Sequence, residues 1–295
     1  MKICSINNNQ NAIAKTNIKY NKRLGFRGIV TQNKMKKFVP ELGSFIFNSY
    51  DISFKNIENF LKRFKPNLKV ISSKIDFLPA KATASSAIGL DENLNPYILS
   101  NEITINAEDT GTFNEKLLLF ECLVHEMTHI YQADLDSDDK HSLHINMDFV
   151  KRKFLENPTQ DTIDRMNEIS KKVYSIYLDL EKRILKDPLF CGFVNSIGFK
   201  NDPDKNIENA FYVAFGKTSK DFIRNFVKEK MKALKITEYN FVEKIIHTHA
   251  KSEIEAFTIS RNAIREILGK DNKQISNSNI MLALYKAILN FRINE

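Results

Sequence analysis

Apolar side chains recur three and four positions apart in several long stretches of this 295-residue chain, which is the pattern of amphipathic helices. The stretch 53–66 begins at Ser53, a typical helix N-cap, and ends at Pro66, which cannot continue a helix. A second, strongly apolar helix is predicted from Asn114 to about Ala133. Beyond residue 157 the helical pattern dominates, and helices are predicted at 163–184, 207–216, 219–234, 239–268 and 277–292.

Short strands are predicted between the first two of these helices. Residues 67–78 form one such segment, residues 87–99 form two apolar arms around a polar Asp-Glu-Asn turn region, and the sequence EITIN at 102–106 alternates apolar and polar residues. A small mixed sheet fits these segments best. With the helices that follow, the pattern indicates the α+β class.

Composition and predicted elements divide the chain into three parts. Residues 1–40 are basic, begin with an Asn-rich stretch and are expected to be flexible, because such a polar segment buries little apolar surface. Residues 41–156 contain the predicted sheet and the apolar helix, and residues 157–295 form a mainly helical subdomain. No internal repeat or long linker separates these parts. We therefore expect the helical half to pack onto the first half and to contribute residues to any functional site there.

The charge is distributed unevenly along the chain. The formal net charge is +8, but residues 81–150 carry 13 acidic against 3 basic side chains, and the excess of Lys and Arg lies on both sides of this segment. A polyanion would therefore be held by the flanks. No nucleic-acid-binding motif accompanies the basic excess, so direct nucleic-acid binding is not favoured.

Compartment and membrane association are constrained by a few simple features. The cysteines Cys4, Cys122 and Cys191 are odd in number and widely spaced, which does not indicate a disulfide framework. No apolar run approaches the roughly 18 residues of a membrane span, and the first 20 residues lack the apolar core of a signal peptide. We expect cytoplasmic synthesis. The polar start also resembles the uncleaved N-termini of bacterial effectors exported by type III secretion, and this resemblance implies secretion into a host cell. An ordinary flexible start is the alternative.

The apolar helix carries His125, Glu126 and His129 in the sequence HEMTH. Helical residues four apart are separated by about 40°, so the two imidazoles point the same way and can hold one metal ion. Glu126 lies about 100° round the helix, where it can reach a metal-bound water as general base. Gln132 and Cys122 share the histidine face, and Cys122 is assigned to packing. Satisfied core histidines are the alternative, because buried polar groups need partners.

His125, Glu126 and His129 match the HExxH signature of the zincin metallopeptidases. The resemblance covers residues 97–135 well and implies a zincin core within 41–156, a Zn2+ cofactor, and hydrolysis of peptide bonds in a protein or peptide substrate, with Glu126 as the catalytic residue. In that superfamily the strand before the helix lines the substrate cleft and binds the peptide in extended form. That role would fall here to Glu102 through Asn106.

The third metal ligand has two candidates. The metzincin pattern is excluded, because IYQADL follows the motif where that class has a glycine and a histidine. The first candidate is His144, with His141 beside it, and this spacing resembles the SprT-like proteases that act on DNA-associated proteins. The usual His-Gly pair of those proteins is absent here. Solvated loop histidines are the alternative for both residues.

The second candidate is Glu253, in the predicted helix 239–268. A helical projection places Glu253 at the centre of the apolar face and Glu255 on the opposite side. A carboxylate on such a face needs a cation or a metal as partner. The ExEA string also resembles gluzincins, in which a later helix supplies a glutamate ligand. His249 lies on the same face, so a metal-free His249–Glu253 pair is the alternative.

The sequence therefore predicts a zinc metalloendopeptidase of gluzincin type, in which His125, His129 and Glu253 hold the metal. An oxyanion stabiliser is expected as well, and Tyr131, Tyr212, His247 and His249 are the available residues, without a feature that chooses among them. Two other functions stay open. One is a SprT-like protease that uses His144, and the other is a non-catalytic zinc-binding protein with a closed site.

Overall fold

The computed structural model describes residues 29–50, 52–73, 81–90, 96–106, 111–133, 160–188, 220–269, 277–289 and 291–293. Helix α1 (Ile29–Asn48) begins inside the segment 1–40 that was expected to be flexible. Its Met35 and Phe38 are fully buried, because the apolar residues of 35–46 lie three and four apart and form one face. Residues 1–28 lie outside the described part of the chain.

Helix α2 (Phe54–Phe64) confirms the helix predicted at 53–66. The Ser53 side chain accepts a hydrogen bond from the Asn56 backbone N–H, as an N-cap does, and Ile57, Phe60 and Leu61 are buried. Aromatic contacts join α2 to α1, since the Phe38 ring lies 6.0 Å from Phe60. The two helices thus share one apolar interface next to the sheet.

The sheet is small and mixed, as predicted, with the strand order β1-β3-β2. Strand β1 (Leu68–Ser72) is parallel to β3 (Pro96–Ile105), and β2 (Ala82–Leu90) is antiparallel to β3. Ile103 pairs with Val70 on one side and with Ala84 on the other. Because β3 is paired along both edges here, the substrate-binding role expected for Glu102 through Asn106 is wrong, and β2 is the edge strand on that side of the described sheet.

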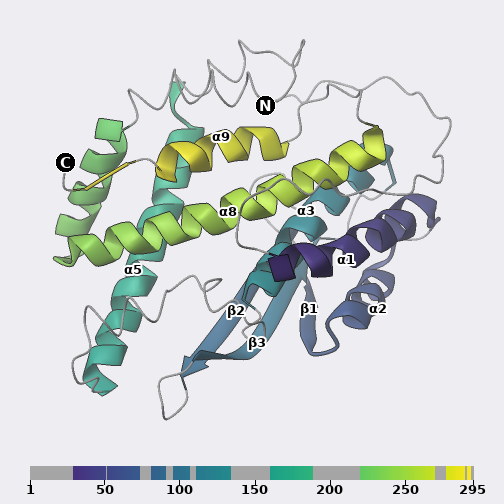
Figure 1. Ribbon diagram of the computed structural model, residues 1–295, viewed down its shortest axis with the longest axis horizontal. Helices are drawn as coiled ribbons and strands as arrows, with labels where there is room; N and C mark the ends of the chain where they lie inside the picture. Colours follow the sequence, from purple (N-terminus) through teal and green to yellow (C-terminus); the bar gives the residue numbers. More distant parts are fainter. Residues whose placement is uncertain are drawn as a thin grey trace.

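Helix α3 (Phe113–Gln132) follows β3 and carries HEMTH. Thr112 and Glu115 form a reciprocal capping box, in which each side chain accepts a hydrogen bond from the other residue's backbone N–H, so the sequence fixes where the helix begins. One side of α3 packs on β2 and α1, and another packs on α8 (Tyr239–Leu268). The helix lies at the centre of the molecule (Figure 1).

The described residues form two apolar cores. The sheet-side core contains α1, α2, α3 and the strands, and includes Leu61, Ile103 and Phe120. The helical core contains α5 (Gln160–Leu185), helical residues 220–233, and α9 (Asn277–Leu289). Helix α8 belongs to both, because its first half packs in the helical core and Ile259, Ala263 and Ile264 pack in the sheet-side core. Figure 1 shows α8 running along the long axis of the molecule, crossing α5 toward one end and passing α1 toward the other.

The helical second half agrees with the sequence prediction in its described parts. Helices α5, α8 and α9 lie at the predicted positions, and the helix predicted at 219–234 is helical over 220–233. The helix predicted at 207–216 lies outside the described residues. The chain is thus a mixed α and β protein with a three-stranded sheet and mostly helical content.

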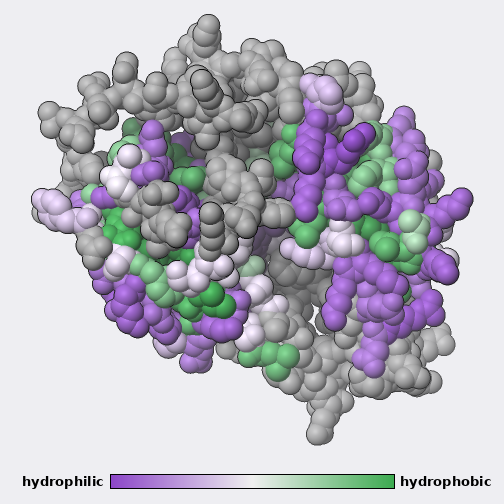
Figure 2. Space-filling view, turned by 180° about the vertical axis from the view of Figure 1, so that it is seen from behind, coloured by the Kyte–Doolittle hydropathy of each residue, from purple (hydrophilic) through white to green (hydrophobic). Residues whose placement is uncertain are grey.

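Charged side chains cover much of the described surface. Figure 2 shows hydrophilic residues over most of the described part of one face, with the hydrophobic residues in separate patches. Within the described residues, no helix combines the length and the hydrophobicity that crossing a membrane requires.

Gly43 marks the close approach of α1 to both α3 and α8. A Cβ atom at Gly43 would lie 3.4 Å from Ile267 Cδ1 and 3.6 Å from Phe120 Cε2. We expect Gly43→Ala to be neutral or stabilising by up to about 1 kcal/mol, because the methyl group fits and alanine favours the helix. Gly43→Leu should lower the free energy of unfolding by about 1–3 kcal/mol through overpacking. Denaturant unfolding of both variants measures their free energies of unfolding. Equal values for Gly43→Ala and Gly43→Leu would contradict the close approach.

Candidate metal centre

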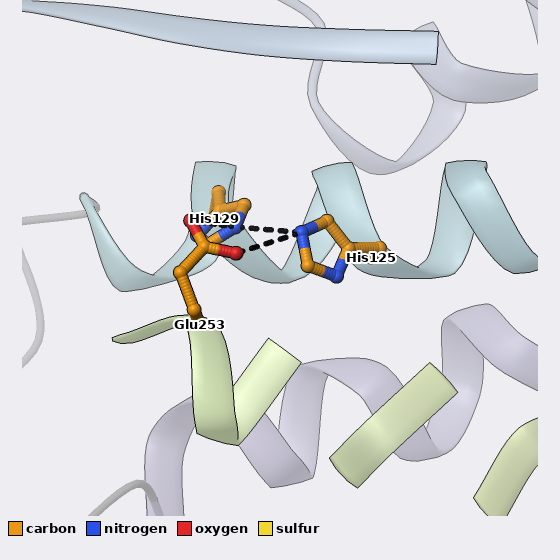
Figure 3. A group of neighbouring side chains, drawn as sticks. All are labelled: His125, His129 and Glu253. Carbon is orange, nitrogen blue, oxygen red and sulfur yellow. Dashed lines mark hydrogen bonds and ion pairs between the residues drawn. The ribbon is translucent and has the colours of Figure 1, made fainter. Parts of the chain in front are cut away.

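His125, His129 and Glu253 form one compact group between α3 and α8. The His125 Nε2 atom lies 3.2 Å from one Glu253 carboxylate oxygen, and the His129 Nε2 atom lies 3.3 Å from the other. The two Nε2 atoms are 2.9 Å apart. Figure 3 shows the histidines on successive turns of α3 and the Glu253 side chain reaching toward them from α8. The group is buried and offers three ligand atoms within 4.8 Å of one another, so it could hold a metal ion.

The spacing of these atoms suits a small tetrahedral ion. Bonds of about 2.0–2.1 Å to imidazole nitrogen and carboxylate oxygen place tetrahedral ligand atoms about 3.3 Å apart. The contacts of 3.2 and 3.3 Å are close to this value, although they join the two nitrogens to different oxygens of the Glu253 carboxylate, and the nitrogens are 2.9 Å apart. Small shifts of the carboxylate and of the two rings would therefore be needed to surround one ion. Two imidazoles and one carboxylate also leave one tetrahedral position for water or substrate.

The fold brings these residues together through the two cores. The histidines lie one turn apart on α3, so their rings project from the same side of the helix. Glu253 lies on α8 within the part that packs in the helical core, between Ala250 and Ile254, and the sheet-side core takes up the helix from Ile259 onward. The hydrophobic face of α8 therefore delivers the carboxylate to α3, and the sequence prediction that Glu253 joins the two histidines agrees with the geometry.

Glu126 lies beside the group and at the outer edge of β2. Its carboxylate accepts a hydrogen bond of 2.8 Å from the Ala84 backbone N–H. Ala84 is paired with Ile103 in the sheet register, yet this N–H is directed to α3 rather than to β3. The arrangement places a carboxylate next to the two histidines and in contact with the backbone of an edge strand.

The charges of the group depend on one another. Burial alone would lower the pKa of His129, but the negative charge of Glu253 and its contact with the ring raise that pKa to about 9. Burial likewise opposes the charge on Glu253, yet the two histidines hold its pKa well below its ordinary value. Burial raises the pKa of Glu126 despite the nearby imidazoles, which makes its carboxylate a better proton acceptor.

A hydrogen-bond network surrounds His129. The Gln132 side chain lies 2.8 Å from His129 Nδ1 and also contacts Ser252 and Glu255 on α8. The helical projection had placed Glu255 on the face opposite Glu253, away from the site. The Gln132 side chain nevertheless reaches the Glu255 carboxylate at 3.0 Å.

Aromatic side chains border the group on the side of the helical core. The His249 ring stacks on Tyr174 and Tyr177 of α5, with centroids 5.1 and 4.9 Å apart. The Phe257 ring lies 4.0 Å from His125. The sequence analysis did not identify the two tyrosines. Their three-residue spacing on one face of α5 was visible, but which helix that face would meet was not.

The four residues considered as oxyanion stabilisers have different surroundings. Tyr131 is buried in the sheet-side core, and Lys34 lies over its ring. His247 Nε2 donates a hydrogen bond of 3.0 Å to the Phe291 carbonyl oxygen, which holds the ring at the C-terminal segment. His249 lies one helical turn before Glu253 on α8. Tyr212 lies outside the described residues. Of the three candidates that the structure describes, His249 is the one placed beside the group.

Tyr174 adds a candidate for the same role. Its ring stacks on His249, one helical turn from Glu253. Burial raises the pKa of its hydroxyl, and the negative charges of Glu253, Glu181 and Glu126 raise it further. The residue is 46% exposed, so it also borders solvent. A neutral phenol in that position can donate a hydrogen bond to a bound substrate.

The remaining predicted residues are less informative. Cys122 packs against the sheet-side core, and burial raises the pKa of its thiol to about 12, which agrees with its assignment to packing. The alternative ligand His144 and its neighbour His141 lie outside the described residues. The Glu253 carboxylate reaches both motif histidines, whereas the His249 ring stacks on tyrosines, so the alternative of a simple His249–Glu253 pair does not describe this group.

The HExxH pattern suggested a relationship to the zincin metallopeptidases. Comparisons of the chain with protein-family models, with curated proteins and with solved structures each return no match. The chemistry of the group is therefore inferred from its own residues and from their distances, burial and charge.

Proposed function

We propose that the protein is a zinc-dependent metallopeptidase of gluzincin type, with His125, His129 and Glu253 as ligands of Zn2+. The observation that carries the proposal is the convergence of the Glu253 carboxylate on both Nε2 atoms at 3.2 and 3.3 Å. Two imidazoles and a carboxylate suit zinc among the common divalent metals. Convergence of Glu253 on the histidines also favours this ligand set over one that uses His144.

Glu126 is the general base of the proposed reaction. Bound zinc would supply Lewis-acid activation of a water and of the scissile carbonyl. The Glu126 carboxylate accepts a proton from the attacking water and passes it to the nitrogen of the leaving amine, which departs as a neutral group. Its raised pKa, caused first by burial, makes the carboxylate a stronger base toward the attacking water.

The substrate is proposed to be an extended peptide along the outer edge of β2. Glu126 accepts the Ala84 N–H at this edge, so backbone donors and acceptors of β2 lie next to the proposed general base. An extended chain can pair with such an edge through backbone hydrogen bonds. Tyr174 and His249 flank the group from the helical side and are the candidates for holding the developing oxyanion.

The ligand assignment predicts the metal content of three proteins. Wild type should bind about one zinc per chain. Glu253→Ala should lose more than about 100-fold in zinc affinity, because loss of a direct ligand exceeds the roughly 10–100-fold cost of losing an outer partner. His144→Ala should keep wild-type affinity. Elemental analysis and chelator competition measure these values, with circular dichroism to verify folding. Zinc loss in His144→Ala alone would assign the third ligand to His144 and favour a SprT-like protease.

The general-base assignment predicts that catalysis and metal binding separate in Glu126→Gln. This variant should retain zinc and lose about 10²–10⁴-fold in the rate of cleavage of a fluorogenic peptide library. The matched control is Glu102→Gln on β3, which removes a carboxylate paired with Lys69 at the surface and should leave the rate unchanged. Cleavage by Glu126→Gln at the wild-type rate would rule out this role.

A further inference from the structure

We propose that Gln132 is a positioning residue, which holds His129 with its proton on Nδ1 and fastens α3 to α8 beside Glu253. This inference rests on the proposed metal site, because its consequence is that His129 presents the Nε2 lone pair to the ion. Gln132 is 2% exposed and lies at the last turn of α3. A polar side chain buried to that extent needs a partner for each of its polar atoms.

The partners of Gln132 fix the direction of its amide. Its Nε2 group donates to the Ser252 carbonyl oxygen at 3.1 Å and to a Glu255 carboxylate oxygen at 3.0 Å. A backbone carbonyl and a carboxylate can only accept, so the NH2 group must face α8. The Oε1 atom is left to face His129 Nδ1 at 2.8 Å, and Ser252 Oγ donates to the same oxygen at 2.5 Å.

The orientation of the amide determines the tautomer of His129. An amide oxygen cannot donate, so a 2.8 Å contact with Nδ1 requires that Nδ1 carry the proton. Ser252 Oγ also lies 3.4 Å from Nδ1, but its hydroxyl proton is directed to the closer Gln132 oxygen. With Nδ1 protonated, the neutral ring keeps its lone pair on Nε2, which is the atom that faces Glu253 and His125.

His125 provides the contrast within the same site. Its Nδ1 atom is buried and has no hydrogen-bond partner among the described residues. Of the two histidines, His129 is therefore the one whose ring is held by the network described above. The network also ends on the Ser252 carbonyl, one residue before Glu253, so a single side chain orients one ligand and anchors the backbone next to another.

Two substitutions separate the roles of Gln132. Gln132→Met keeps the length of the side chain and removes both the acceptor and the donors. Gln132→Glu keeps an acceptor for His129 Nδ1–H but loses the donors to α8. We expect zinc affinity, measured by chelator competition, to fall about 10–100-fold in Gln132→Met and less in Gln132→Glu. Lys116→Met is the matched control, since it removes another α3 contact, to the Ser49 carbonyl, without touching His129.

The deciding measurement is the ring ¹⁵N spectrum of His129 in the metal-free protein, at a pH at which the ring is neutral. Wild type, Gln132→Glu and Lys116→Met should show the proton on Nδ1, whereas Gln132→Met should shift toward the Nε2–H form. A wild-type ring protonated on Nε2, or identical spectra and zinc affinities in wild type and Gln132→Met, would overturn the inference. Because the spectrum needs no metal, failure of wild type to bind zinc would refute the proposed function without changing this result.

Discussion

The packing of α3 on α8 is the contact on which the rest of the site depends. Hydrophobic burial brings these helices together, since α8 contributes apolar residues to both cores. Burial is not directional, however, and the polar groups at the crossing fix the alignment. His125 and His129 meet Glu253 there, and Gln132 bonds to α8 beside them. A small axial shift of either helix would separate the carboxylate from the imidazoles.

Local signals explain what could be predicted of the fold. Helices α2 and α3 have N-cap side chains at Ser53 and Thr112, and α8 has a long apolar face, so their positions follow from the sequence. Helix α1 was not predicted, because Pro40 lies inside it and a proline disfavours a helix interior. The helix forms nevertheless, since burial of its apolar face outweighs this cost. The strands were recognised, but the central place of β3 depends on the parallel pairing with β1, which alternation does not encode.

The candidate site likewise has features that follow from the sequence and features that depend on tertiary packing. His125, Glu126 and His129 are related by spacing within one helix, and Glu253 was found as a carboxylate on an apolar face. Contacts between helices were not accessible in this way. The contact of Glu126 with Ala84, the position of Tyr174 and the reach of Gln132 to Glu255 all depend on how distant segments pack. Periodicity indicates on which face of a helix a residue lies, but it does not indicate which element packs against that face.

Glu253 lies on the part of α8 that packs in the helical core, whereas the two histidines lie on α3, which packs in the sheet-side core. An ion held by α3 and α8 would act as a crosslink between the sheet-side half and the helical half. Free metal at about 1,000 times its dissociation constant adds about 4 kcal/mol to the stability of the folded state. The supply of such a metal in the surroundings would thus set how firmly the two halves hold together.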